Sequence, residues 1–335
     1  MLRKRTFSKY IIATFNVTNI SNSTQILGWN QDNTSVTYDL TQIKSIKIDD
    51  KIITPRTHYQ FTSTGVKTVV YYLNSNFTTM QNMFRNCVTM NTVNFTNCNT
   101  NNVINMRALF HTCTSLTNII VNNNWKTHNV QDFGYMFYNC TNLTSNIVEP
   151  FLVYFNTKKA TTFDSMFNSC QKIQSLRFDK FPNFKTQNAT NMKYMFSNMK
   201  ALISYDYSGK YGSDNYGFKG IKLNDNNGNN MLDTSNVQNM EGIFSGCSNT
   251  DFTYLNLKWN YNNLRYCKWM FSGCANLYTL TMMGNIYSDI QSANCEQMFY
   301  DCPQYGNFYY NKNVSIYTSI IIPQLQALNW TCTGQ

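Results

Sequence analysis

A phenylalanine followed three residues later by a cysteine recurs along this sequence, and one copy has methionine in place of the cysteine. Thiols can act as nucleophiles or as zinc ligands, so this spacing first raises the question of reactive chemistry. The eight pairs are Phe84 with Cys87, Phe110 with Cys113, Phe137 with Cys140, Phe167 with Cys170, Phe196 with Met199, Phe244 with Cys247, Phe271 with Cys274 and Phe299 with Cys302. Copies spread from residue 84 to residue 302 indicate a structural role, because an active site uses its nucleophile in one place.

The sequence contains few residues in the patterns that catalytic or metal sites require. The three histidines are His58, His111 and His128, and His111 with Cys113 would form a nucleophile pair only if that thiol were exposed. A zinc site drawing on Cys267, Cys274, Cys295 and Cys302 is the weaker alternative, because no CxxC pair is present. No phosphate-binding glycine loop and no HExxH motif occurs. We predict no enzyme activity, no cofactor and no metal.

The phenylalanines define a repeat. Their successive spacings are 26, 27, 30, 29, 48, 27 and 28 residues, and repeats of 20–29 residues are typical of leucine-rich repeats. The interval of 48 fits one period plus an insertion at residues 208–230, which is rich in Gly, Asn and Asp and is predicted to be a surface loop. Its aromatic residues Tyr211, Tyr216 and Phe218 are candidate binding contacts, although packing against the repeats is the stronger alternative.

Each unit has two parts. Apolar residues lie four and one before the phenylalanine, at it, and three after it, which predicts one face of a short helix. A preceding Thr-x-Asn-Val supplies candidate N-caps, and β-prone runs follow at residues 92–95, 118–121, 175–178, 254–257 and 279–282. We therefore predict helix–turn–strand units of about 27 residues that stack into an α/β repeat solenoid resembling leucine-rich repeats, with Phe as core anchor and Cys as small apolar filler.

Free thiols are expected throughout. The sequence has eleven cysteines, of which Cys98 and Cys332 lie off the pattern. Helices packed side by side are about 8–10 Å apart, whereas a disulfide needs Cα atoms within about 7 Å. Equivalent positions in neighbouring units should therefore be too far apart to bond, and the thiols should be mostly free and buried.

The two ends differ from the repeats. Residues 1–9 form a basic arm with Arg3, Lys4, Arg5 and Lys9. Residues 10–75 contain β-prone runs at 10–17, 35–40, 43–48, 58–61 and 66–73, which predict a small antiparallel, sandwich-like β domain that caps the solenoid. The solenoid of about eight units then covers residues 76–312, and residues 313–335, with a strand-like run at 315–322, form the other cap.

The composition limits the classes of molecule that the chain is expected to bind. The net charge is +10, but charged residues make up only 13% and no basic stripe interleaved with aromatic residues appears, so nucleic acid is not the main partner. No run approaches the 18 or so apolar residues of a membrane span, and the start lacks a secretion signal. The basic arm is either solvated or contacts an acidic partner.

The motif TxNVxNMxxMFxxCxxL resembles the repeat of BspA-type leucine-rich repeat surface proteins. It is clearest in THNVQDFGYMFYNCTNL (residues 127–143) and TSNVQNMEGIFSGC (residues 234–247), and the sixth copy departs from it at residues 248–250. Residues 43–73 are also similar to the small β domain that precedes such repeats in proteins of gut bacteria and their phages.

The resemblance implies adhesion or surface display without catalysis. Because no signal is visible, we expect a bacteriophage virion component made in the host cytoplasm, such as a head or tail fibre or a decoration protein on the virion surface. Its N-terminal region would attach to other virion proteins, its solenoid would face a host-surface protein or glycan, and fibres of this kind are often trimers. The alternative is a BspA-type adhesin on a bacterial or protist cell surface.

Overall fold

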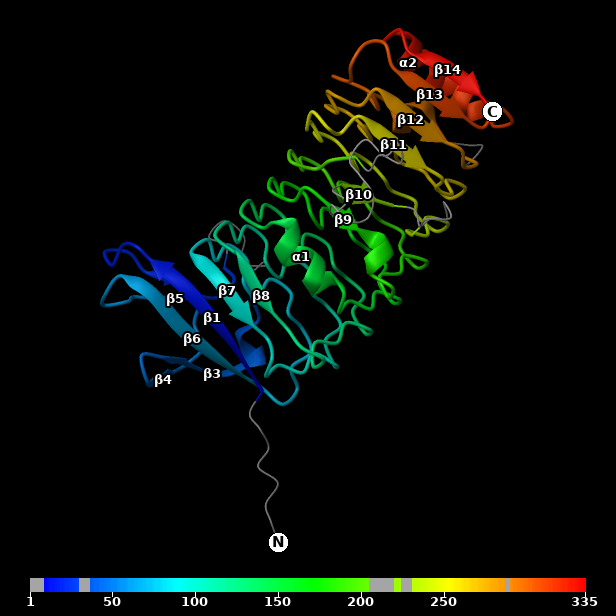
Figure 1. The fold of residues 1–335 in the computed structure, drawn as a ribbon. Helices are drawn as coiled ribbons and strands as arrows, with labels where there is room; N and C mark the ends of the chain where they lie inside the picture. Colours follow the sequence, from blue (N-terminus) through cyan, green and yellow to red (C-terminus); the bar gives the residue numbers. More distant parts are fainter. Residues whose placement is uncertain (1–8, 30–36, 205–219, 224–230, 287–289) are drawn as a thin grey trace.

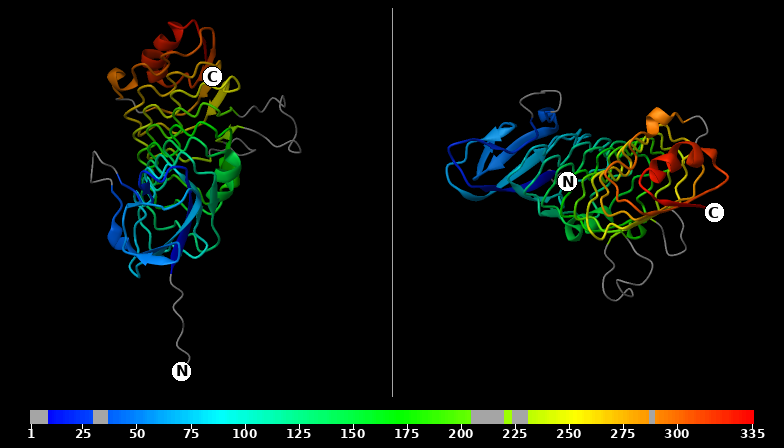
Figure 2. Two further views of the ribbon diagram at one scale, coloured as in Figure 1. Left: turned by 90° about the vertical axis from the view of Figure 1, so that its left-hand side faces the viewer. Right: turned by 90° about the horizontal axis from the view of Figure 1, so that it is seen from above.

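The computed structural model describes residues 9–29, 37–204, 220–223, 231–286 and 290–335. The molecule is elongated, with a sheet of N-terminal strands at one end and the C-terminal strand at the other (Figure 1). Between these ends the repeats stack as successive coils of the chain, which two further views show from the side and from above (Figure 2).

The N-terminal strands and the first coils share one six-stranded sheet, ordered β4-β3-β6-β1-β7-β8. Its members are β1 (Tyr10–Val17), β3 (Ile43–Ile48), β4 (Lys51–Ile53), β6 (Gly65–Leu73), β7 (Met90–Asn94) and β8 (Asn118–Ile120). Strand β1 pairs antiparallel with both β6 and β7, whereas β7 and β8 are parallel. The sheet therefore continues across residue 75, where the sequence suggested a domain boundary.

The sequence-predicted strands of this region mostly form. Residues 10–17 and 43–48 are strands with those bounds, and β2 (Thr24–Gln25) pairs with β5 (His58–Tyr59) in a separate ribbon. The predicted strand at residues 35–40 is wrong in its described part. There the chain enters a 3-10 turn, η2 (Leu40–Gln42), because the Asp39 side chain accepts a hydrogen bond from the Thr41 amide and starts the turn.

The predicted helices around the phenylalanines are wrong, because these segments are chains of tight turns. Residues two before and two after each phenylalanine have positive φ, for example Ala108 at 55° and Thr112 at 57° around Phe110. A right-handed helix cannot include such residues. The offsets that place four side chains on one helix face also place them on the inner side of this turn, so the apolar positions are buried as predicted.

Hydrogen bonds between coils replace those of a helix. The amides of Asn82, Phe84 and Asn86 donate to the carbonyls of residues 107, 109 and 111 in the next coil at 2.8–2.9 Å. The same three bonds recur at each of the following interfaces, up to those from Trp269, Phe271 and Gly273. Alternate residues thus bond to the neighbouring coil as they do between parallel strands, at a spacing of about 4.8 Å.

The eight anchor phenylalanines form one continuous column. Neighbouring rings from Phe84 to Phe299 stack with centroids 5.5–6.2 Å apart and planes within 20° of parallel. The pair Phe196 and Phe244 stacks at 5.5 Å although 48 residues separate them in the chain. The inserted residues therefore leave the stack without interrupting it.

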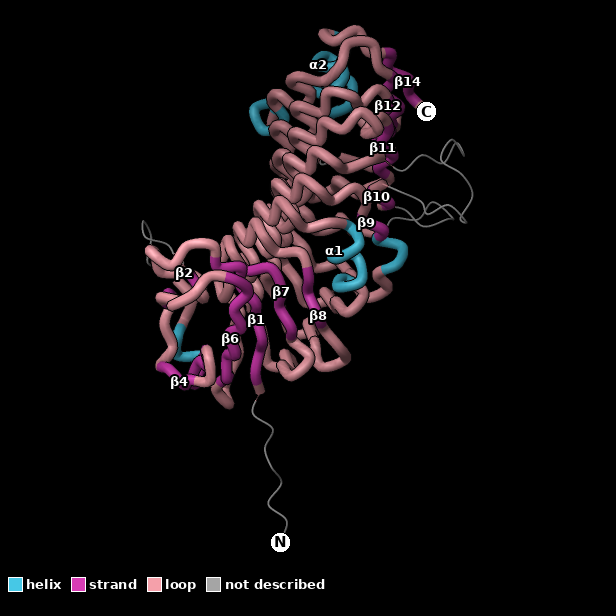
Figure 3. The backbone as a smooth tube through the Cα atoms, turned by 60° about the vertical axis from the view of Figure 1, so that its left-hand side comes forward, coloured by secondary structure: helices cyan, strands magenta, loops and turns pink. Residues whose placement is uncertain are grey.

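Short strands line another side of the coils (Figure 3). They are β9 (Leu176–Arg177), β10 (Ile221–Lys222), β11 (Tyr254–Leu257), β12 (Thr279–Met282) and β13 (Asn307–Tyr310), all in parallel pairs. The predictions at 254–257 and 279–282 are confirmed with those bounds. One coil carries the helix α1 (Ser145–Leu152) on this side, and η3 (Phe178–Lys180) follows β9.

Part of the predicted loop forms a strand of a two-stranded sheet. Residues 220–223 are buried, and β10 pairs in parallel with β9, so this part is not the surface loop that the sequence suggested. The candidate contacts Tyr211, Tyr216 and Phe218 lie outside the described residues.

The C-terminal segment is helical where a strand was predicted. Residues 315–322 contain a π-helical turn, η6 (Tyr317–Ile321), that leads into α2 (Ile322–Gln326). The buried residues Tyr317, Ile321 and Leu325 recur every four positions, which suits a helix, and Pro323 is tolerated in the first turn of α2. The strand β14 (Thr331–Gly334) follows and extends the sheet beside β13.

Candidate functional site

The cysteines that follow the phenylalanines lie inside the stack and bind its backbone. The Cys113 thiol donates to the Phe84 carbonyl and the Cys140 thiol to the Phe110 carbonyl, each at 3.0 Å. Cys170, Cys247, Cys274 and Cys302 make the same bond, at 3.0–3.2 Å, to the phenylalanine of the preceding coil. The thiol thus joins neighbouring coils in addition to filling space, a role that the sequence alone did not indicate.

This geometry separates the residues of the conceivable nucleophile pair. Cys113 is fully buried, and burial raises the pKa of its thiol well above the ordinary value. His111 instead stacks on Tyr138, with ring centroids 4.6 Å apart. The structure therefore does not bring the Cys113 thiol and the His111 ring together as a reactive couple.

All eleven cysteines are free and ten are buried, with Cys332 half-buried, which confirms the prediction of free thiols. The argument that neighbouring units are 8–10 Å apart is nevertheless wrong, because the coils approach as parallel strands do. Cys267 and Cys295 lie close enough for a hydrogen bond between their thiols, which raises the pKa of Cys267 together with burial. No group of three or more metal-ligating side chains gathers among the described residues.

Buried threonines form a second row of ties between coils. The Thr157 hydroxyl donates to the Lys185 carbonyl and accepts from the Lys185 amide, both at 2.7 Å. Thr100, Thr127 and Thr234 pair in the same two ways with residues 126, 156 and 260. Thr100, Thr127 and Thr234, which begin the Thr-x-Asn-Val copies, were predicted as candidate N-caps, but no helix forms there and each one bonds the following coil instead.

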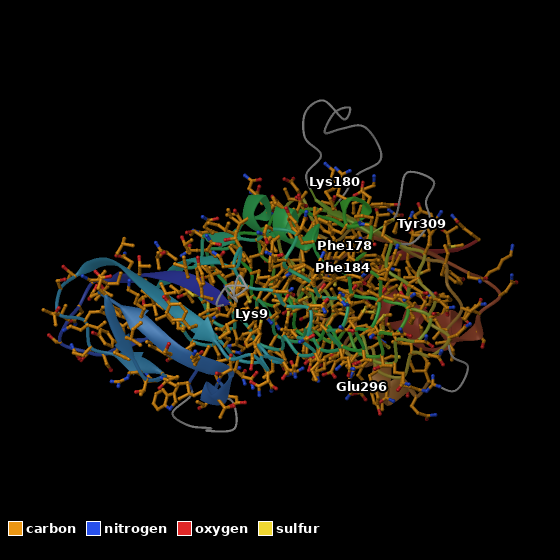
Figure 4. The ribbon with its side chains drawn as sticks, turned by 90° about the horizontal axis from the view of Figure 1, so that it is seen from below. Lys9, Phe178, Lys180, Phe184, Glu296 and Tyr309 are labelled. Carbon is orange, nitrogen blue, oxygen red and sulfur yellow. The ribbon has the colours of Figure 1, made fainter. Side chains whose placement is uncertain are left out.

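The outer side of the turns carries charged and aromatic residues, mostly three before or one after each phenylalanine. We call this surface the turn face. Glu296, which belongs to it, lies on the side of the molecule opposite Lys180 and Tyr309, with the interior residues Phe178 and Phe184 between (Figure 4). Ion pairs cross the coils here, including Lys193 with Glu241 at 2.8 Å and Lys268 with Glu296 at 3.1 Å.

One ion pair of the turn face spans two coil interfaces. The Arg107 guanidinium donates to both carboxylate oxygens of Asp164 at 2.9 Å and also contacts Asp132 at 3.3 Å. The intervening coil has Gly134 at this position, where a Cβ atom would lie 2.3 Å from both Arg107 Nη1 and Asp164 Oδ1. Any residue with a Cβ atom at position 134 would collide with this ion pair, so glycine is required there.

Gly134→Ala should therefore lower the free energy of unfolding by about 1–3 kcal/mol, because the added methyl group breaks a bidentate, partly buried ion pair. Chemical denaturation of the two proteins measures the difference. Asp164→Asn removes the ion pair by itself. In that background, Gly134→Ala should lower the free energy of unfolding markedly less than it does in the wild type. An equal cost in both backgrounds would contradict the assigned role of Gly134.

An aromatic and cationic cluster occupies the N-terminal part of the turn face. The His111 ring lies 4.6 Å from Tyr138 and 6.1 Å from Tyr135, and Arg107 lies 4.8 Å above the Tyr135 ring. Arg85 lies beside this cluster, and its Nε is buried without a hydrogen-bond partner in the described structure. Burial, and then the neighbouring Arg85, lower the pKa of His111 to about 3.

His111 should make stability depend on pH. Since its pKa is lower in the folded than in the unfolded chain, the unfolded chain binds the additional proton, and stability falls as the pH drops below about 6.5. From pH 7 to pH 5 this loss should reach up to about 2 kcal/mol. The variant His111→Phe keeps a ring in the stack but cannot bind the proton. Its free energy of unfolding, measured by denaturation at both pH values, should fall less between pH 7 and pH 5. An unchanged loss would assign the effect to other groups.

The C-terminal end of the turn face contains a groove of about 760 Å³. Residues 296–302 of the last coil form one wall, and residues 319–328 form the other. Tyr300 on its rim is 60% exposed. Within the part of the chain that the structure describes, no helix has the length and apolar character that crossing a bilayer requires.

Residues 64–208 and 215–320 match a protein family described as Mycoplasma protein of unknown function, DUF285. The chain belongs to this family. The match includes all eight anchor phenylalanines and begins one residue before β6, so it covers the repeats together with one strand of the N-terminal part of the sheet. The family is related to the BspA-like repeat proteins. This agrees with the resemblance of the motif, as far as membership in a family of repeat proteins is concerned. Comparison with curated proteins and with solved structures gave no match.

Proposed function

We propose that the chain is a non-enzymatic binding protein displayed on an outer surface, and that its stacked repeats form a leucine-rich-repeat-like solenoid that presents the turn face to a receptor. The interior of the stack is filled by the phenylalanine column and the thiols, so ligands are left to the outer surfaces, as is usual for repeat proteins. The observation that carries the proposal is the cluster of His111, Tyr138 and Arg85 on this face.

The chemistry of this cluster favours a glycan or a protein surface as the ligand. Tyrosine and histidine rings offer large contact area at low entropic cost, and arginine is enriched at the energetic centres of interfaces. Arg85 carries a charge that no carboxylate neutralises among the described residues. An acidic group on the ligand would supply the missing partner.

Two settings are compatible with this role. In a bacteriophage virion, as a head or tail fibre or a decoration protein, the chain would attach through its N-terminal region to other virion proteins and face the host with its repeats. On a cell surface it would act as an adhesin of the BspA type. The family's description as a Mycoplasma protein favours the second setting.

Binding to host-cell surfaces and to an array of glycans tests the proposal. His111→Ala with Tyr138→Ala should weaken binding at least tenfold, whereas Tyr309→Ala on the opposite face should leave it unchanged. Binding that neither change affects would refute the turn face as the site. Mass spectrometry of purified phage particles and surface proteolysis of intact cells would then decide between the two settings.

A further inference from the structure

The last coil has an open row of backbone donors. At every earlier interface the amides two before, at, and two after the phenylalanine donate to the following coil, and the last such set runs from Trp269, Phe271 and Gly273 to residues 296, 298 and 300. The equivalent amides of Gln297, Phe299 and Asp301 have no acceptor among the described residues. One edge of the stack therefore ends with unpaired donors.

The opposite edge of the stack is closed. Its first coil offers carbonyls, and the Met83 carbonyl accepts from the Gly28 amide at 2.8 Å while the Arg85 carbonyl accepts from the Gln25 side chain at 2.7 Å. A Cβ atom on Gly28 would lie 1.7 Å from the Asn82 carbonyl oxygen, which shows how tightly this segment covers the coil. The first coil of a second copy thus cannot stack directly on the open row.

The C-terminal cap covers the last coil only in part. Gln324 accepts from the Met298 amide at 3.1 Å and donates to the Cys295 carbonyl at 2.9 Å, and Trp330 packs beside Phe299. The groove of about 760 Å³ remains between the cap and the coil, and it is lined by apolar Phe299, Ile320 and Leu328. The residues of the three unpaired amides all line this groove.

We propose that this groove binds an extended basic peptide segment, and that in this chain the occupant is residues 1–8 of a second copy. Donors on alternate residues match the alternate carbonyls of an extended chain, which is how an added strand binds a sheet edge. Each of the three amides would then regain the kind of partner that its counterparts have in every other coil.

Charge favours this occupant. Glu296 and Asp301 line the groove; Lys268 pairs with Glu296, while Asp301 has no ion-pair partner in the described structure. Residues 1–8, MLRKRTFS, contain three consecutive cationic side chains. Because these three side chains are adjacent in the sequence, at least one of them could reach Asp301 while the backbone occupies the groove.

A second copy must supply the segment. Strand β1 begins at Tyr10, at the end of the molecule opposite β14 (Figure 1). Eight residues span at most roughly 29 Å, whereas seven coil spacings alone amount to roughly 34 Å. The contact would join unlike ends of two copies, so it is heterologous and generates a line of molecules. It goes beyond the proposed receptor binding, which uses a different part of the turn face.

Titration of the full chain with a fluorescent peptide, MLRKRTFSKY, tests the site. We expect saturable binding that Asp301→Asn weakens at least fivefold, since asparagine accepts the positive φ of 55° at this position. The matched control is Asp50→Asn, an exposed aspartate with φ of 65°, which should bind as the wild type does. A peptide with serine at positions 3–5 should bind at least tenfold more weakly.

Hydrogen exchange and sedimentation complete the test. Amides of residues 296–302 should gain protection when the peptide binds, and full-length protein should associate in a concentration-dependent way that deletion of residues 2–8 abolishes. Binding without protection at 296–302, or equal loss in Asp50→Asn, would overturn the groove as the site. A full chain that stays monomeric would overturn the second copy as the occupant. Receptor binding measured on the deletion variant remains a separate readout.

Discussion

Replacing Phe137 with alanine should lower the free energy of unfolding by about 3–5 kcal/mol. Phe137 is fully buried and stacks between Phe110 and Phe167, with 5.6 Å between ring centroids on either side. The substitution opens a cavity in the middle of the column, and the hydrogen bonds between coils keep the neighbouring rings from closing it. Guanidinium denaturation, followed by circular dichroism, measures the change.

Two further variants make this prediction specific. Phe137→Leu retains most of the volume and should cost only about 1–2 kcal/mol. Val66→Ala removes an apolar side chain that is 65% exposed, and stability should change by less than about 0.5 kcal/mol. A cost for Phe137→Ala no larger than that for Val66→Ala would mean that the column contributes little to stability.

Thr157→Val should lower the free energy of unfolding by about 2–4 kcal/mol although the two side chains have nearly the same shape. Thr157 is fully buried, and its hydroxyl is bonded to both the amide and the carbonyl of Lys185. Valine leaves these two backbone groups without partners, and each unpaired buried group costs about 1–3 kcal/mol. Denaturation curves in urea give the difference.

A variant that keeps the hydroxyl but removes the methyl group separates the hydrogen bonds of Thr157 from its packing. Thr157→Ser keeps both bonds and should lose only about 1 kcal/mol for the methyl group. Thr161→Val, in the same coil, removes an exposed hydroxyl that bonds the Gln131 carbonyl at 3.2 Å, and should be nearly neutral. If Thr157→Ser were as damaging as Thr157→Val, packing rather than the hydrogen bonds would explain the loss.

Much of the repeat could be predicted because it depends on residue spacing. The period placed Phe110 and Phe137 in one column, and their burial followed from the apolar neighbours at fixed offsets. Strands at residues 254–257 and 279–282 formed with the predicted bounds because alternate apolar residues specify which side is buried. The burial of the thiols also followed from their apolar neighbours, whereas the separation of units from which free thiols were predicted was wrong.

The turn conformation could not be predicted from the same spacing. Offsets of three, one and three residues suit one face of a helix and equally the inner side of the observed turn. A further signal was present: Asn, Gly and Asp, which tolerate positive φ, recur two residues from the phenylalanine, as at Asn139, Gly246 and Asp301. Ala108 and Tyr135 obscure it, because neither residue type indicates such a backbone.

The sequence by itself determined the period, the insertion and the identity of the buried column, since these depend on chemistry that repeats along the chain. Only the tertiary structure decided that coils bond to one another as strands do, that Thr157 ties two of them, and that Arg107 reaches Asp164 past Gly134. It also decided that, among the described residues, the amides of Gln297, Phe299 and Asp301 have no acceptor. The physical reason is that these features join residues 25 or more positions apart, and such pairings depend on how closely the coils approach.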